Sequence, residues 1–288
     1  MRVYVIPVTR LRWALHCNPV NAVPTRMTQW ALKASGKWSQ WAVYPRESWR
    51  GRIYAYGESL MDRIDFREYF LKEIPTKDEG RLVSKVDIVA PALLSESEII
   101  AELRALAQRQ EPYHGRWMKY CCYMVPLTSL FTVVPVVPNF PLFYNLFRVY
   151  SHYKARHGAR HLLHMLDRGS YEVVHDSELS RWYEGAAPRR LDSPDSRTLP
   201  AASGRCSPSE APLLGPESDA ADADQRTLEG GAPLLEDPVL VTDGDVASMG
   251  TYLQLPLFES AIRRARHQIV ARLSKPPPPP PPSPPPSR

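Results

Sequence analysis

The chain has 288 residues, of which 43% are hydrophobic and 23% are charged, so a core of ordinary size can form. A mean hydropathy of −0.35 excludes a transporter built mostly of membrane helices. The net charge of +5 is unevenly spread: residues 1–190 carry 27 Lys or Arg against 18 Asp or Glu, residues 191–250 carry 3 against 12, and residues 251–288 carry 6 against 1. This pattern indicates a basic body, an acidic linker and a basic end.

The first ninety residues predict a small sheet and two helices. Residues 2–8 and 11–17 are rich in β-branched and aromatic residues, which favours two strands. Hydrophobic residues then recur every three or four positions over 25–45 and again over 49–64, which predicts two tryptophan-rich helices. Residues 83–90 alternate between apolar and polar side chains and predict another strand.

The middle of the chain predicts further helices. Ser95 and Glu98 have the spacing of a capping box, so a helix is expected to begin there. The segment from Tyr120 to Phe147 contains no charged residue over 28 positions, which exceeds the roughly 20 residues needed to span a bilayer. A short strand is expected at 171–174.

Closely spaced prolines divide the uncharged segment. Each of them removes a backbone donor and restricts the residue before it, so a single straight helix is excluded. We expect two helices, at about 113–134 and 140–166, joined by a tight turn. The residues of that turn are Pro135, Pro138, Asn139 and Pro141.

The uncharged segment permits three interpretations. It is a membrane hairpin or a pair of short spans, a single kinked span, or the buried hairpin of a soluble domain. Aromatic and basic flanks favour membrane contact, since such residues gather where a bilayer meets water. The interfacial anchors that we expect are Trp117, Lys119, Tyr153 and Lys154.

A long and specific run, PxxPNxPxFYxxFRxYSH, occupies residues 135–152. It resembles the core of the mitochondrial K+/H+ exchange-related family, which is found largely in fungi and other lower eukaryotes. The resemblance covers roughly residues 1–168 and, weakly, residues 256–273. The residues that carry it are Pro126, Thr128, Phe143, Tyr144, Phe147, Arg148, Tyr150, Ser151, His152 and His161.

This resemblance implies a mitochondrial inner-membrane protein that takes part in, or supports, potassium–proton exchange. A cation–proton exchanger needs an ionisable group inside the membrane, yet residues 112–147 contain no Asp or Glu. Backbone carbonyls near the prolines are an alternative cation site, but they would require oligomerisation. We therefore expect an accessory or regulatory component that supports K+ and volume homeostasis, with other exchanger subunits or a homo-oligomer as partners.

The sequence offers no motif for an enzyme or a cofactor, since Walker A, dinucleotide, GxSxG, HExxH and EF-hand patterns are absent. His157, His161 and His164 share one helix face, but the basic residues around them favour an interfacial helix over a metal site. The helical spacing of the tryptophans favours packing or interfacial anchoring over a ligand cage. We expect no enzyme activity, no cofactor, no metal and no nucleic acid, and we expect anionic lipid as a partner.

The composition changes after about residue 186. Residues 186–255 are expected to form an acidic disordered linker, residues 256–274 a basic amphipathic helix, and residues 275–288 a polyproline tail. The tail is typical of ligands of SH3, WW or profilin-type domains, although low-complexity tails also occur without a partner. It supports an alternative function, a non-transport membrane-associated scaffold or interaction protein that recruits partners through its tail.

Together these elements predict an α+β fold that is mostly helical. Its core, residues 1–185, would combine a small N-terminal β-sheet, Trp-rich helices and a Pro-turned hydrophobic helical hairpin that associates with a membrane at about 113–166. The first 46 residues hold seven Lys or Arg and no acidic residue, which resembles a mitochondrial import signal by charge. The mitochondrial inner membrane, reached through at least one transmembrane helix, is the expected location.

Overall fold

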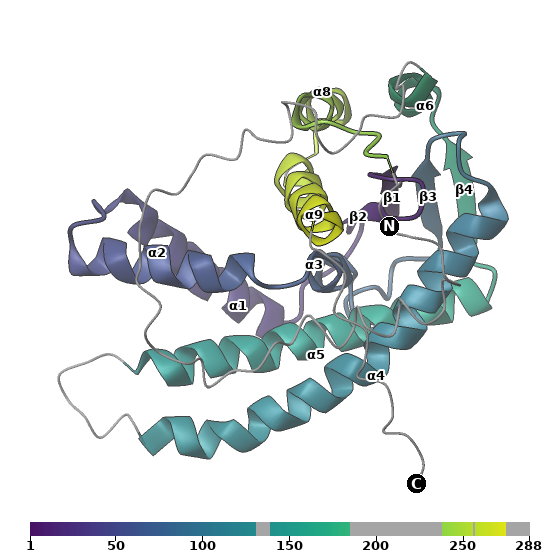
Figure 1. Cartoon of the computed structure of the whole chain (residues 1–288). Helices are drawn as coiled ribbons and strands as arrows, with labels where there is room; N and C mark the ends of the chain where they lie inside the picture. The colour runs from purple at the N-terminus through teal and green to yellow at the C-terminus, as the bar shows by residue number, and fades with distance from the viewer. Residues whose placement is uncertain (131–138, 185–237, 256, 275–288) are drawn as a thin grey trace, which may run out of the picture.

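The computed structural model describes residues 1–130, 139–184, 238–255 and 257–274. The predicted fold class is confirmed, because most of the described chain is helical and a small four-stranded sheet forms one end of the molecule (Figure 1). A pair of long helices runs away from the sheet. A second pair of helices lies beside the half of this long pair that is farther from the sheet (Figure 1).

The sheet has the strand order β2-β1-β3-β4. Its strands are β1 (Arg2–Pro7), β2 (Trp13–Asn18), β3 (Val86–Ala90) and β4 (Tyr171–His175). β1 pairs antiparallel with β2 and parallel with β3, and β3 pairs parallel with β4. The four predicted strands are thus confirmed, with bounds that differ by a few residues.

The two faces of the sheet carry two separate cores. Side chains alternate along a strand, so Val3 and Val5 of β1 join one hydrophobic cluster while Tyr4 and Ile6 join the other. The first face is covered by α3 (Phe66–Glu73), α4 (Glu96–Ser129) and α5 (Phe140–Asp167). The second face is covered by α6 (Ser177–Glu184), α8 (Asp243–Leu253) and α9 (Phe258–Leu273).

A helical arm follows the first two strands. It consists of α1 (Arg26–Ser39), η1 (Gln40–Val43) and α2 (Trp49–Asp62). Trp38 lies between Trp41 and Tyr54, with ring centroids 5.7 and 5.4 Å away, so the arm is held together by its own aromatic side chains. No side chain of α1 is buried, which leaves most of the arm facing solvent.

The capping box at the start of α4 is confirmed. The Ser95 backbone N–H donates to Glu98 Oε2 at 3.0 Å, and the Glu98 N–H donates to Ser95 Oγ at 3.3 Å. From there α4 continues for 34 residues through Pro112 and Pro126 and ends at Ser129. The expectation of a new helix at 113–134 is therefore corrected, because the capped helix and the apolar helix are one element.

The C-terminal region is more ordered than the sequence indicated. Helix α8 lies within the stretch that we expected to be linker, so residues 238–255 belong to the fold, whereas residues 186–237 lie outside the described residues. Helix α9 occupies the place of the predicted basic amphipathic helix. The Leu240 N–H donates to Val8 O at 2.8 Å, which joins this returning segment to the residue after β1. The polyproline tail lies outside the described residues.

Within the described parts of the chain, no helix combines the length and the apolar character that crossing a membrane requires. The predicted transmembrane helix is therefore not found among these residues.

Candidate functional site

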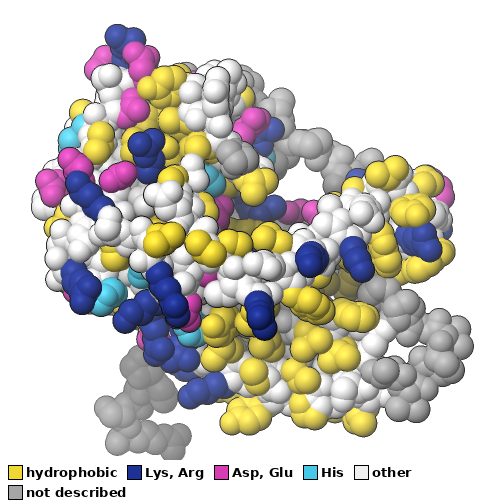
Figure 2. Space-filling model, turned by 180° about the vertical axis from the view of Figure 1, so that it is seen from behind, with side chains coloured by type: hydrophobic (Ala, Val, Ile, Leu, Met, Phe, Trp, Pro, Cys, Tyr) yellow, Lys and Arg dark blue, Asp and Glu magenta, His cyan; other side chains and the backbone are white. Residues whose placement is uncertain are grey.

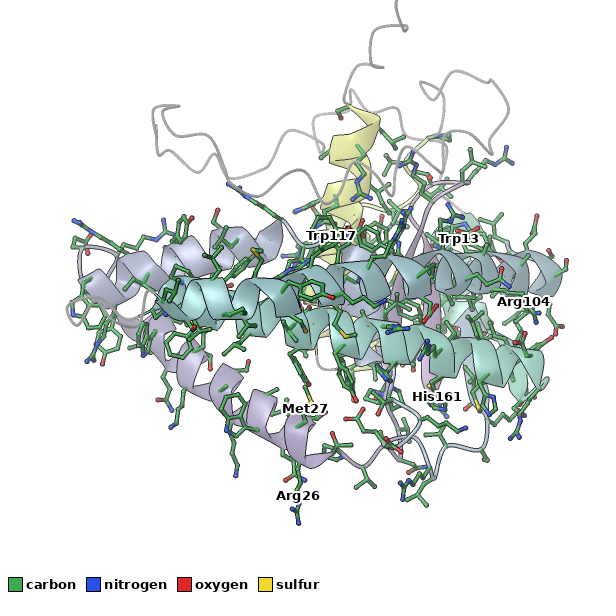
Figure 3. All side chains as sticks on the ribbon, turned by 90° about the horizontal axis from the view of Figure 1, so that it is seen from below. Trp13, Arg26, Met27, Arg104, Trp117 and His161 are labelled. Carbon is green, nitrogen blue, oxygen red and sulfur yellow. The ribbon has the colours of Figure 1, made fainter. Side chains whose placement is uncertain are left out.

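Most of the family-motif residues lie on α5, which runs beside α4 (Figure 1). Figure 3 shows Trp117 on α4 and His161 on α5 at different levels along this hairpin. The turn residues Pro135 and Pro138 lie outside the described residues, whereas Pro141 lies in the first turn of α5. Asn139 is the N-cap of α5: its Oδ1 accepts from the Leu142 N–H at 2.9 Å, and its Nδ2 donates to the Thr128 carbonyl of α4 at 2.8 Å.

A buried ion pair forms where α3 and α5 meet. Arg148 donates from Nη1 to Glu68 Oε1 at 2.9 Å, and only 6% and 5% of the two side chains are exposed. The Ser151 hydroxyl donates to the same carboxylate oxygen. Burial alone would raise the pKa of Glu68, but the positive charges around it, chiefly Arg148 and Lys72, together outweigh this effect and lower the pKa to about 2. Glu68 is therefore a permanent anion near neutral pH.

Two histidines extend this pair toward α4. Arg148 Nη2 lies 3.0 Å from His152 Nε2, and His152 Nδ1 lies 2.9 Å from His114 Nδ1. A guanidinium only donates, so His152 Nε2 must accept and its proton must sit on Nδ1. That proton is donated to His114 Nδ1, which leaves the proton of neutral His114 on Nε2. The four side chains thus form one directed hydrogen-bond chain from Glu68 to His114.

The end of this chain is unusual. His114 is 1% exposed, and its Nε2 has no hydrogen-bond partner among the described residues. Burial lowers the pKa of His114 to about 4, and burial together with the nearby Arg148 charge lowers that of His152 to about 3. Both imidazoles are therefore neutral near neutral pH, as the directions of their hydrogen bonds require.

Three residues of this hydrogen-bond chain also meet the distance requirement of a metal site, because ligand atoms of Glu68, His114 and His152 lie within 4.8 Å of one another. The contacts of Arg148 argue against a metal ion. A metal on His152 Nδ1 would place the proton on Nε2, where it would face the donor of Arg148. The guanidinium already balances the only carboxylate, so a bound cation would add uncompensated buried charge. The residues fit an internal ion pair rather than a metal.

A second buried ion pair lies nearer the sheet. Lys154 of α5 donates to Glu79, and the two side chains are 10% and 3% exposed. The Thr76 N–H also donates to Glu79, at 3.0 Å, and His161 Nδ1 lies 2.7 Å from the Pro75 carbonyl. α5 is therefore joined to the loop after α3. Because Lys154 lies inside the fold, we do not propose it as a lipid contact.

The other predicted residues lie along the two long helices. Pro126 is inside α4, where the Thr128 hydroxyl donates to the carbonyls of Met124 and Val125. Phe143 is 62% exposed. Three of the remaining residues make ring contacts: Tyr144 with Phe147, Trp117 with Tyr113 and Tyr120, and Tyr153 with His157. Tyr150 is half-buried, and Lys119 is exposed.

Sequence reasoning missed the acidic residue of each ion pair and one histidine of the hydrogen-bond chain. Glu68 and Glu79 lie far before the motif, and His114 lies 38 positions before His152. The only sequence signal was that Arg148 and His152 are four residues apart on a helix, so that two polar side chains share one face. Nothing local indicated their partners, since these come from other helices and loops.

Comparison with known proteins agrees with the motif. The family described as mitochondrial K+-H+ exchange-related matches residues 2–166. An uncharacterised protein of Schizosaccharomyces pombe is 25% identical over 187 residues, which cover 63% of this chain and 82% of the relative. An uncharacterised protein of Saccharomyces cerevisiae is 36% identical over 202 residues, so the match covers 58% of this chain and 63% of that relative's length.

Among solved structures, none matches the chain. The family match nevertheless spans both ion pairs and the three strands β1, β2 and β3. The name of the family points to mitochondria and to potassium–proton exchange. This chain belongs to the mitochondrial K+-H+ exchange-related family.

Proposed function

We propose that this protein is an accessory or regulatory component of potassium–proton exchange at the mitochondrial inner membrane, where it supports K+ and volume homeostasis. Membership of the family supports the link to exchange. The accessory role rests on one observation: Arg148 and His152 of the motif are paired with Glu68 and His114 inside the protein.

Exchange requires a group that binds and releases protons under working conditions. The pKa of Glu68 is held at about 2, and those of His114 and His152 at about 4 and 3. None of these groups changes its protonation state near neutral pH. Glu79 is likewise ionised, because hydrogen bonds from Lys154 and Thr28 overcome the effect of burial and lower its pKa to about 2. The network therefore suits a structural frame for three helices better than a proton carrier.

The test is the swelling of isolated mitochondria in potassium acetate, which requires potassium–proton exchange. We expect mitochondria that lack the protein to swell more slowly, and we expect the wild-type chain to restore the rate. Unchanged swelling without the protein would remove the exchange role. A variant with the exposed substitution Leu82→Ser serves as the control that restores swelling fully.

Reconstitution separates an accessory component from an exchanger. Liposomes that contain only the purified chain are expected to show no potassium-dependent proton flux above that of protein-free liposomes. Robust exchange by the chain alone would contradict the accessory role while leaving the exchange role in place.

A further inference from the structure

The outer half of α4 carries a stripe of exposed apolar side chains. Its members recur with the period of a helix and therefore share one helix face. They are Tyr120, Tyr123, Met124, Leu127 and Leu130, with exposed fractions of 59, 72, 46, 53 and 65%. At 1.5 Å per residue the stripe is about 15 Å long. Scattered apolar residues are normal on a protein surface, but a continuous stripe marks an interaction site.

The same end of the molecule has two more apolar contributions. Phe143 and Leu146 of α5 are 62% and 43% exposed. The arm adds Trp30 and Leu32 of α1, which are 74% and 61% exposed. Figure 1 places the arm beside the outer half of α5, with α4 on the other side of α5, at the end away from the sheet. We call this end, formed by the α4 stripe, the outer part of α5 and the arm, the distal end.

The exposed charge next to the stripe is basic. Of the six Lys or Arg in residues 112–166, four pair with acidic residues of other segments, which leaves Arg116 and Lys119 beside the stripe. Residues 26–62 add six Lys or Arg and three acidic residues. Arg116 and Lys119 are exposed just before the stripe, and neither has an acidic partner among the described residues. Figure 2 shows a broad hydrophobic area on the lower part of this face with Lys and Arg side chains along its border.

From this arrangement we infer that the distal end docks onto an anionic lipid bilayer, with the α4 stripe lying in the plane of the headgroups. A helix binds this way when one face is apolar and its flanks are basic, because apolar burial and attraction to anionic lipid act together. Tyrosine and tryptophan favour such a position, since their rings are amphipathic. A protein partner would need a surface with an apolar strip bordered only by acidic groups. An anionic bilayer presents apolar chains beside negatively charged headgroups over its whole surface.

The inference gives the proposed function a lipid partner but does not depend on exchange. The full chain is expected to float with vesicles of phosphatidylcholine that contain added phosphatidylglycerol, and to float much less with phosphatidylcholine alone. Added salt is expected to weaken binding to the anionic vesicles, because the basic residues act through screened charge.

Two variants test the surface itself. Tyr123→Ser with Leu127→Ser is expected to weaken vesicle binding by about tenfold or more, which corresponds to losing the burial of one or two large apolar side chains. Arg116→Gln with Lys119→Gln is expected to reduce the preference for anionic vesicles. The matched control is Leu82→Ser with Leu93→Ser, which alters leucines that are 69% and 53% exposed but lie outside the distal end, and its binding should equal that of the wild type.

Each result decides the matter. Equal binding by the stripe variant and the wild type would overturn the proposal. The proposal would also be overturned if the wild type did not bind vesicles and sedimented as a dimer while the stripe variant sedimented as a monomer. The stripe would then join two copies of the chain. If a variant that no longer floats with vesicles still restores mitochondrial swelling, the docking surface is not needed for the proposed function, which stands. If the wild type floats normally but its loss does not change swelling, the docking surface stands and the exchange role does not.

Discussion

Arg148 connects groups from three helices through a single side chain. Its guanidinium donates to Glu68 of α3 and to His152 of its own helix, and His152 in turn contacts His114 of α4. Because these groups are removed from water, each depends on its neighbour for compensation of charge or hydrogen bonding. The energetic importance of the network therefore lies in leaving none of its charges unpaired.

Replacing Arg148 with Met removes the cation and leaves the Glu68 carboxylate buried without it. We expect the free energy of unfolding to fall by about 3–5 kcal/mol, the usual cost of breaking a buried pair from one side. The double variant Glu68→Gln with Arg148→Met should lose less than the sum of the single variants, as urea denaturation will show. The exposed pair Arg81–Asp78 gives a control, since Arg81→Met should change stability by less than about 0.5 kcal/mol.

The neutral histidines make stability depend on pH. In the unfolded chain they bind protons below the ordinary pKa of 6.5, but in the folded protein His114 does so only near pH 4 and His152 near pH 3. Stability is therefore greatest above pH 6.5 and falls as the pH is lowered, by about 1.4 kcal/mol per pH unit for each histidine. Below pH 4.5 Glu68 adds to the loss, because its folded pKa is depressed.

Urea denaturation at a series of pH values between 6.5 and 4.5 measures this slope. The variant His114→Asn is expected to remove about half of the slope that the histidine pair causes, and the exposed substitution His175→Asn serves as the control. A stability that does not change over this range would contradict the neutral, buried state of the pair.

At the scale of elements, α3 and α5 approach closely at a glycine. A Cβ placed on Gly158 would lie 2.1 Å from the Leu71 carbonyl oxygen and 3.3 Å from Ile74 Cβ. Contacts this short with backbone atoms cannot be relieved by a change of rotamer, so the two helices would have to separate. Separation would also strain the Glu68–Arg148 pair, which joins the same two helices.

We therefore expect Gly158→Ala to destabilise the protein by about 1–3 kcal/mol, the usual cost of overpacking a core. Gly36→Ala in α1 is the matched control, because a Cβ there meets no atom within 4 Å. It should stabilise the protein slightly, by up to about 1 kcal/mol, since alanine favours a helix more than glycine does. Thermal unfolding of both variants measures the difference, and equal midpoints would refute the close approach.

The elements also show what sequence reasoning could reach. The strands, the capping box and α5 follow from local patterns, and they were predicted nearly to their ends. The continuity of α4 through Pro112 was not predicted, because a proline costs a helix one hydrogen bond and tertiary packing against α5 outweighs that cost. The ion pairs were missed for a different reason: Glu68 and Arg148 are 80 positions apart, and only the fold brings them together.

At the scale of the whole molecule, the C-terminal segment completes the protein. Phe258, Ile262 and Ile269 of α9 are fully buried against the face of the sheet that carries Tyr4 and Ile6. Polar contacts reinforce this packing, since Arg272 pairs with Asp65 at 2.8 Å and Gln268 accepts from the Phe66 N–H at 2.9 Å. Residues 238–255 and 257–274 are thus part of the folded body, although the family match ends at residue 166.

A protease site inserted between residues 185 and 237 tests this dependence. After cleavage, the two fragments are expected to remain together during size-exclusion chromatography, because the buried contacts of α8 and α9 do not require a continuous chain. A chain ending at residue 184 should expose the face around Tyr4 and Ile6 and unfold at a lower temperature. Fragments that separate after cleavage would show that α9 contributes little to the fold.

Strand β1 has a further consequence for how the protein reaches this fold. The Met1 amino group contacts the Lys85 carbonyl 84 positions away, and α9 reaches back to α3 over more than 200 positions. Proteins dominated by such distant contacts fold slowly, since long loops must close before any contact is gained. The face of β1 that carries Tyr4 and Ile6 is covered by α8 and α9, so this apolar surface stays open until the C-terminal helices have been made. An apolar surface that stays open this long is a site for chaperone binding or aggregation during folding.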